Sequence, residues 1–153
     1  MPGMGSLITE TEVEKFLESC TLNIQVATID ENGYPNIQPI WFYYDRDSEK
    51  LYVATRKTTK KVQNIRRNPD KIYFSIDDEN FPYKGVKGRG EASISENTQK
   101  NVPIVEKIIL KYLGTLDQPL AKTMMETARN GTEVVIEITP RFFSAWDFGK
   151  AAW

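Results

Sequence analysis

A hairpin signal near the N-terminus restricts the fold more than any other feature of the chain. The pair Asn32-Gly33 separates two apolar stretches, residues 22–29 and 35–44. Asn-Gly favours the tight turn between neighbouring antiparallel strands, because both residues tolerate the positive φ that this turn requires. A third strand is predicted at 50–55, after a short polar turn. The chain therefore starts its sheet with sequential antiparallel strands.

The rest of the chain continues in groups of strands. Apolar and alternating stretches predict further strands at 71–77, 83–95, 132–139 and 141–146, the last two separated by Pro140. Helices are predicted at about 10–20, 59–67, 97–113 and 117–130, with Pro103 interrupting or restarting the third. Strands in hairpin-sized groups, not alternating one for one with helices, argue against a parallel dinucleotide-binding sheet.

The stretch 83–95 carries three glycines, which mark bulges, curvature or close backbone approach inside a strand. Small barrels need such curvature. We predict one mainly β domain over residues 1–153, a six- to seven-stranded antiparallel barrel with short flanking helices. Residues 1–8 are expected to be a disordered start or an expression-vector remnant.

The amino-acid inventory excludes several kinds of chemistry. The sequence has no histidine, so Ser-His-Asp and Cys-His catalysis and histidine-based zinc motifs are excluded. Its single cysteine, Cys20, excludes internal disulfides and is expected to be buried on the first helix. We predict no metal site, and an enzyme of this composition would draw its reactive chemistry from a bound cofactor. Without a membrane span or signal peptide in the sequence, a cytoplasmic location is expected.

Positive charge is concentrated in the segment 55–69. Six basic residues and no acid lie between Arg56 and Asn68, although the whole chain has a net charge of −1. Thr55 ends a predicted strand and Thr59 begins the next helix. Hydroxyls and cations at a helix N-terminus suit a phosphate ester, because the first helical N–H groups point outward there. The alternative is a solvated basic helix face.

Two aromatic stretches could line a flat ring. Gln38 precedes Pro39, and because proline cannot donate to a ladder, this strand should have a free edge or a bulge beside Trp41. In the last strand, alternation places Trp146 on one face with Phe142. Burial in the core is the alternative for these aromatic residues.

In this order, the motifs resemble the pyridoxamine 5′-phosphate oxidase-like superfamily of flavin-binding split barrels. The pattern is an Asn-Gly-Tyr-Pro turn, a strand with Pro-Ile-Trp, a strand ending in Thr55, and Thr-Lys-Lys leading through a short helix to Asn-Pro at 59–69. Gly-Arg-Gly-Glu at 88–91 resembles a further family motif. The resemblance covers residues 10–95 and the Phe-x-x-Trp-x-x-Gly at 143–149. It implies a split barrel.

The resemblance also implies the residues that bind the cofactor, which is FMN or, alternatively, a deazaflavin coenzyme. Cations and hydroxyls would hold the ribityl phosphate, namely Thr55, Thr59, Lys60 and Lys61. A second group would lie along the ring, largely through backbone contacts, namely Gln38, Pro39, Ile40 and Trp41. Tyr83 and Trp146 would approach the ring from a second subunit, because family members are homodimers with cofactor sites in the interface.

Departures from the family pattern narrow the function. The oxidase itself has an arginine and a lysine where this chain has Pro39 and Tyr44, and it binds substrate phosphate with a histidine. We therefore do not expect oxidation of pyridoxamine phosphate, and the missing histidine also disfavours haem. The favoured hypothesis is hydride transfer through bound FMN, or a deazaflavin, to an unknown small substrate. The alternatives are a non-catalytic flavin-binding storage or sensing protein and a nucleic-acid module, against which the near-neutral charge argues.

Overall fold

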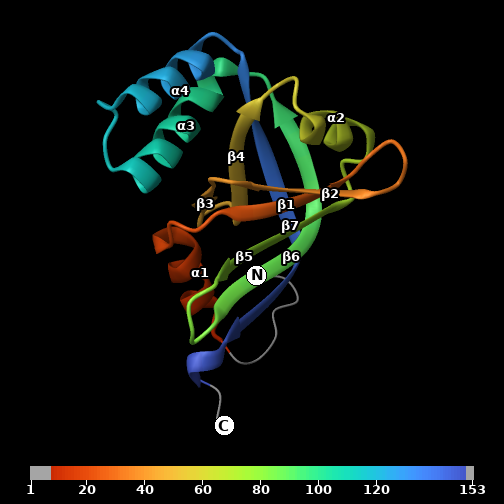
Figure 1. The fold of residues 1–153 in the computed structure, drawn as a ribbon, viewed down its shortest axis with the longest axis vertical. Coiled ribbons are helices and arrows are strands. Elements are labelled where there is room, and N and C mark those ends of the chain that lie inside the picture. The colour runs from red at the N-terminus through yellow and green to blue at the C-terminus, as the bar shows by residue number, and fades with distance from the viewer. Residues whose placement is uncertain (1–7, 151–153) are drawn as a thin grey trace.

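The computed structural model describes residues 8–150, which form one seven-stranded antiparallel sheet with peripheral helices (Figure 1). The strand order is β2-β1-β5-β6-β7-β4-β3, and the sheet is not closed, which confirms the predicted split-barrel class. The strands are β1 (Ile24–Ile29), β2 (Pro35–Ile40), β3 (Tyr43–Asp45), β4 (Lys50–Arg56), β5 (Ile72–Asp78), β6 (Lys84–Ser95) and β7 (Glu133–Asp147). The helices are α1 (Glu10–Ser19), α2 (Lys60–Arg67), α3 (Thr98–Leu113) and α4 (Pro119–Arg129), followed by the 3-10 turn Phe148–Lys150.

Two hydrophobic cores stabilise this arrangement. The larger lies inside the curved sheet, where α1 buries Val13 and Leu17 and α2 buries Val62 and Ile65. The smaller lies between the α3–α4 pair and the outer side of β4 and β7. Figure 1 shows α3 and α4 together on one side of the sheet and α2 on the other side at the same end. The start of α2 is thereby fixed against the barrel.

The predicted strand at 35–44 is in fact two strands, which corrects the sequence analysis. β2 pairs with β1 and β3 pairs with β4, and the chain breaks at Trp41 and Phe42. β2 and β3 form the two edges of the sheet, so this break crosses the gap that leaves the barrel split. Periodicity could not show the break, because both strands are apolar. The predicted free edge beside Pro39 is confirmed, since β2 is an edge strand.

Proline positions produce two more corrections. The predicted strands on either side of Pro140 are one continuous strand, because Pro140 lies opposite Gly90 at a register shift that tolerates a missing donor. Pro103 neither interrupts nor restarts α3, which is continuous. Burial of Val105 and Ile108 against the second core offsets the one lost helical hydrogen bond.

The N-terminal part follows the sequence analysis with small changes. Thr9 forms the expected capping box with Glu12. Ile8, expected in a disordered start, is 4% exposed and lies in the larger core, while residues 1–7 lie outside the described part of the chain. Cys20 caps the end of α1 and is only partly buried, and burial raises the pKa of its thiol.

Two sequence-level exclusions can be compared with the structure over residues 8–150. Within this range, no helix combines the length and apolar character that crossing a membrane would require. The cytoplasmic location stays a prediction. The same residues contain no group of three or more Cys, Asp or Glu side chains placed to hold a metal ion.

Candidate functional site

The basic segment begins where β4 ends and α2 starts. Thr59 is the N-cap residue of α2, and its side chain makes no capping hydrogen bond. Its Oγ1 lies 3.5 Å from Oγ1 of Thr55, which is the second to last residue of β4 and is buried. Strand and helix thus place two hydroxyls beside the first turn of α2, whose N–H groups have no intrahelical partner.

Lys61 is the most informative side chain of this region. It is 7% exposed, and its Nζ donates to Gln38 Oε1 on β2 at 3.0 Å. No carboxylate of residues 8–150 forms an ion pair with it, and burial lowers the pKa of its ammonium group. A buried cation whose acceptor is a neutral amide leaves most of its desolvation cost uncompensated. The site therefore favours an added anion.

Polar side chains continue from Lys61 along the inner face of β1 and β2. Asn64, also on α2, donates through Nδ2 to Thr28 Oγ1 on β1 at 3.0 Å. Thr28 pairs in register with Asn36 on β2, so both side chains point to the same face. The buried Oδ1 atoms of Asn36 and Asn64 have no hydrogen-bond partner in the described structure. Orphaned buried acceptors of this kind suit a ligand that brings hydroxyl donors.

Three other cations of the segment form ion pairs away from Lys61. Lys60, which the sequence analysis grouped with Lys61, forms an ion pair with Glu31 at 2.6 Å and is partly exposed. Arg67 lies 3.8 Å from the same carboxylate, and Arg66 lies 3.4 Å from Glu96. Both arginine side chains are about half exposed, which fits a solvated face at the end of α2. Within the Thr-Lys-Lys motif, Lys61 is buried and bonded to Gln38, whereas Lys60 is paired with Glu31.

A small cavity of about 260 Å³ is lined by three of the residues predicted to lie along a ring. Pro39, Ile40 and Trp41 line one side of it. The other side is formed by residues that the sequence analysis did not single out, namely Asn23, Ala54, Ile108 and Met124. Ala54 directly precedes Thr55, and Pro39 directly follows Gln38. Neighbours along a strand point to opposite faces, so the cavity is close to the Lys61 cluster along the chain but lies on the other face of β4 and β2 at these positions.

Trp41 is held in place by Tyr112 of α3. The two rings stack with centroids 4.8 Å apart and an angle of 5° between their planes. The Tyr112 hydroxyl donates to the Leu22 carbonyl at 2.6 Å and accepts from the Phe42 amide at 3.2 Å, and burial raises the pKa of this phenol. No sequence signal identified Tyr112, Ile108 or Met124, because they come from helices distant in sequence and looked like ordinary core residues.

Tyr83 and Trp146 lie at the other end of β6 and β7. Trp146 pairs with Gly85, and Tyr83 contacts Phe81 and Phe148 edge to face, with centroids 5.6 and 5.9 Å away. Lys61, in contrast, lies near the opposite ends of these strands, where α2 contacts β6 (Figure 1). One chain does not bring the two groups together. Their expected approach from a second subunit stays a prediction.

Comparisons with known proteins identify a matching family and similar structures. The family model described as pyridoxamine 5′-phosphate oxidase matches residues 9–147. No curated protein matches the chain by sequence.

Several solved structures share the fold. The conserved hypothetical protein Rv2991 from Mycobacterium tuberculosis is 24% identical with a TM-score of 0.79, covering 94% of this chain and 87% of that one. An F420 reductase is 26% identical with a TM-score of 0.64, covering 85% of this chain and 94% of that one. HutZ, the heme storage protein from Vibrio cholerae, is 14% identical with a TM-score of 0.65, covering 86% and 89%.

Proposed function

The chain belongs to the pyridoxamine 5′-phosphate oxidase family, and from this premise we propose that it is an oxidoreductase that binds FMN between α2 and β2. A deazaflavin coenzyme is the alternative cofactor. The likeness to an F420 reductase at 26% identity supports an oxidoreductase of one of these two kinds. The substrate is a small molecule whose identity neither the sequence nor the fold specifies.

The observation that carries the proposal is the buried, unpaired ammonium of Lys61. A phosphate would supply the missing negative charge, and charge-assisted hydrogen bonds of this kind are strong. The hydroxyls of Thr55 and Thr59 and the outward N–H groups of α2 add fixed donors on the same side. The orphaned oxygens of Asn36 and Asn64 suit the hydroxyls of a ribityl chain. The donor set thus fits both parts of such a cofactor.

The cavity at Trp41, which a cofactor would reach around the β2 edge, fits the ring. Its walls are mostly apolar, and β2 offers a free backbone edge at Pro39 and Ile40. When bound, the flavin or deazaflavin supplies the hydride-transfer chemistry. The chain binds the phosphate, orients the ring between β2 and α3, and excludes water with Met124 and Ile108. No catalytic side chain is assigned.

We further propose that the protein works as a homodimer. Two exposed apolar patches support this assembly. One is on β2 and its turn, where Ile37 is 62% exposed and Tyr34 is 69% exposed, and the other is formed by Phe81, Tyr83 and Phe148. If the second patch of one subunit covers the first patch of the other, Tyr83 and Trp146 reach the partner's ring cavity. Tyr83 and Trp146 can then contact a ring bound by the other subunit, although they lie far from the ring cavity of their own chain.

Titration of the purified chain with FMN and with coenzyme F420 tests the cofactor. We expect saturable binding and a spectral shift with one of them, and binding of neither at high micromolar concentration would contradict the proposal. Stopped-flow reduction by NAD(P)H, or by reduced F420, then separates an oxidoreductase from a non-catalytic storage or sensing protein. A stably bound cofactor that neither donor reduces would favour the storage or sensing alternative.

Sedimentation analysis tests the dimer. Ile37→Glu should dissociate it, because a carboxylate on this apolar patch cannot be buried unpaired. Leu110→Glu is the matched control, since Leu110 is similarly apolar and exposed but lies on α3. If both variants sediment like the wild type, the dimer does not use β2.

A further inference from the structure

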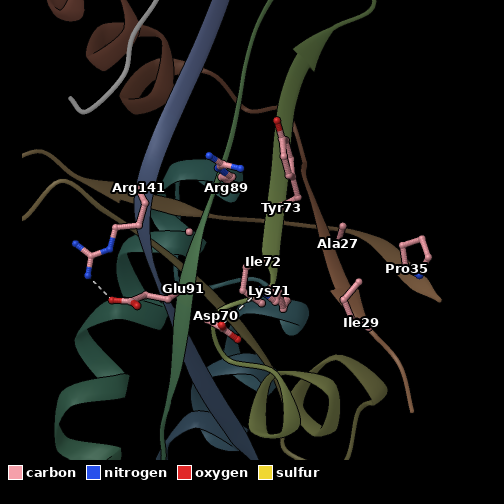
Figure 2. Close-up of a pocket in the computed structure, with 11 residues that line it drawn as sticks. Ala27, Ile29, Pro35, Asp70, Lys71, Ile72, Tyr73, Arg89, Glu91 and Arg141 are labelled. Atoms are coloured by element: carbon pink, nitrogen blue, oxygen red, sulfur yellow. Dashed lines mark hydrogen bonds and ion pairs between the residues drawn. The ribbon is translucent and has the colours of Figure 1, made fainter. Parts of the chain in front are cut away.

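A second concave site lies on the outer face of the sheet, away from Lys61. Its volume is about 540 Å³, roughly twice that of the cavity at Trp41. It spans β1, β5, β6 and β7, and Figure 2 shows the side chains around it. Ala27 and Ile29 line it, whereas Val26 and Thr28, which alternate with them on β1, point to the inner face that holds Lys61. The sheet itself separates the two sites.

Positive side chains outnumber negative ones around this outer pocket. Arg141 pairs with Glu91, and Lys71 lies 3.6 Å from Asp70 (Figure 2). Arg89 forms no ion pair with any carboxylate of residues 8–150, and its guanidinium lies 5.8 Å from the Phe142 ring centroid. Three cations and two carboxylates leave one positive charge, and that charge is centred on Arg89.

A β-bulge shapes this charged wall. Arg89 pairs with Phe142 and Gly90 pairs with Pro140, so Arg141 is the extra residue of β7. A Cβ at Gly90 would lie only 2.1 Å from the Thr139 carbonyl oxygen, which explains why this close approach needs glycine. Bulges re-aim side chains, and this one turns Arg141 toward Glu91. The pairing occupies both Arg141 and Glu91 and leaves Arg89 as the available donor.

The remaining surface of the outer pocket is apolar and aromatic. Tyr73 pairs in register with both Arg89 and Ala27, so the three side chains lie side by side on the outer face. Tyr73 is 42% exposed, and Ile29 and Ala27 continue the apolar surface beside it, whereas the Ile72 side chain is buried in the larger core on the other face. Figure 2 shows Arg89 between Tyr73 and Arg141. An available guanidinium thus stands next to a partly exposed ring and an apolar floor.

We propose that this outer pocket binds a small aromatic monocarboxylate. The carboxylate would accept the paired N–H donors of Arg89, whose planar fork matches a carboxylate, and the ring would pack on Tyr73 and the apolar floor. A single surplus positive charge matches a monoanion better than a phosphate dianion. This second ligand site goes beyond the proposed cofactor function, because it lies on the other face of the sheet and shares no residue with the Lys61 cluster.

An NMR titration of the full chain with benzoate tests the proposal. We expect shifts at Tyr73 and Arg89, and binding at least about tenfold weaker for Arg89→Gln, the scale of a lost charge-assisted hydrogen bond. Benzamide, an uncharged analogue, should bind the wild type more weakly than benzoate does, by a similar factor. Lys87→Gln is the matched control, because Lys87 has the same strand and face but lies outside the pocket. It should bind benzoate as the wild type does.

Three results would overturn this proposal. Equal benzoate affinity in Arg89→Gln and the wild type would exclude the guanidinium as the receptor. Loss of benzoate binding in Lys61→Met would show that the anion occupies the cofactor site. A changed association state in Arg89→Gln with unchanged benzoate affinity would assign this face to a second copy of the chain. Failure of FMN and F420 to bind leaves the benzoate result unaffected, so the two proposals can fail separately.

Discussion

Lys61 is buried and Lys111 is partly buried, and the two lysines have different surroundings. Lys111 of α3 donates to the Leu17 carbonyl at 3.0 Å and lies 3.5 Å from the Phe42 ring centroid. Lys61 donates only to the neutral Gln38 amide. Burial lowers the pKa of both, to about 8 for Lys111. Lys111 has a carbonyl and an aromatic face fixed around it, whereas Lys61 has a neutral amide and lies in the first turn of α2, whose N-cap side chain makes no capping hydrogen bond. Burial alone therefore does not identify a ligand-binding lysine, but its surroundings do.

The largest expected effect separates the two lysines by cofactor affinity. Lys61→Met should weaken cofactor binding by about 1.5–3 kcal/mol, the contribution of a hydrogen bond to a charged group. Lys111→Met should change the affinity much less, because Lys111 contacts no residue of the Lys61 cluster and reaches the cavity at Trp41 only through the Tyr112 ring, 5.4 Å away. Fluorescence titration with the cofactor measures both. Arg66→Ala is a charge-matched control on α2, and an equal loss there would mean that diffuse positive charge, not a site, attracts the phosphate.

A second variant should convert Lys61 into a lysine whose charge is already compensated. Gln38→Glu places a carboxylate where Oε1 now accepts from Lys61 Nζ. We expect cofactor affinity to fall about tenfold, because the new charge competes with the phosphate for one ammonium. The cofactor-free protein should melt at a higher temperature. Tighter cofactor binding by this variant would contradict the assignment of Lys61 as the phosphate ligand.

A third variant measures what Lys111 does for stability. Lys111→Met should lower the free energy of unfolding by about 1–2 kcal/mol, because it removes a cation–π contact and leaves the Leu17 carbonyl without its donor. Denaturant unfolding gives the value. Lys107→Met, one turn earlier on α3, removes a longer contact to Tyr43 at 5.0 Å and should cost less. Equal costs would mean that the Lys111 contacts contribute little.

The last expected effect is a pH dependence of stability. The pKa of Lys111 is lowered to about 8 in the folded protein, while the unfolded side chain keeps its ordinary value near 10.4. Between these pH values the unfolded state binds more protons, so stability should rise with pH in this window. Thermal unfolding of the wild type and of Lys111→Met from pH 7 to 10.5 isolates the contribution. The difference in stability between the wild type and Lys111→Met should change with pH. A difference that stays constant would exclude a contribution from the Lys111 pKa.

The residue types of the candidate site could be predicted from the sequence more readily than its extent. Thr55, Thr59 and Lys61 were predicted because a strand end, an N-cap position and a helical turn are local features, and their role as phosphate ligands stays a prediction. Lys60 could not be separated from Lys61, since its pairing with Glu31 depends on a turn 29 positions away. Met124 and Tyr112 were missed for a similar reason. Only the docking of α3 and α4 against β4 brings them to Trp41.

By itself, the amino-acid sequence determined the antiparallel class, the mainly β content with peripheral helices, the capping box at Thr9 and the family. These follow from short-range patterns, namely turn residues, periodicity and motif spacing. Only the tertiary structure decided that 35–44 divides into two edge strands, that Pro140 is accommodated in a bulge, and that Arg89 and Lys61 lie on opposite faces of the sheet. The physical reason is that register, burial and ion pairing depend on which distant segments meet, and no local pattern encodes that choice.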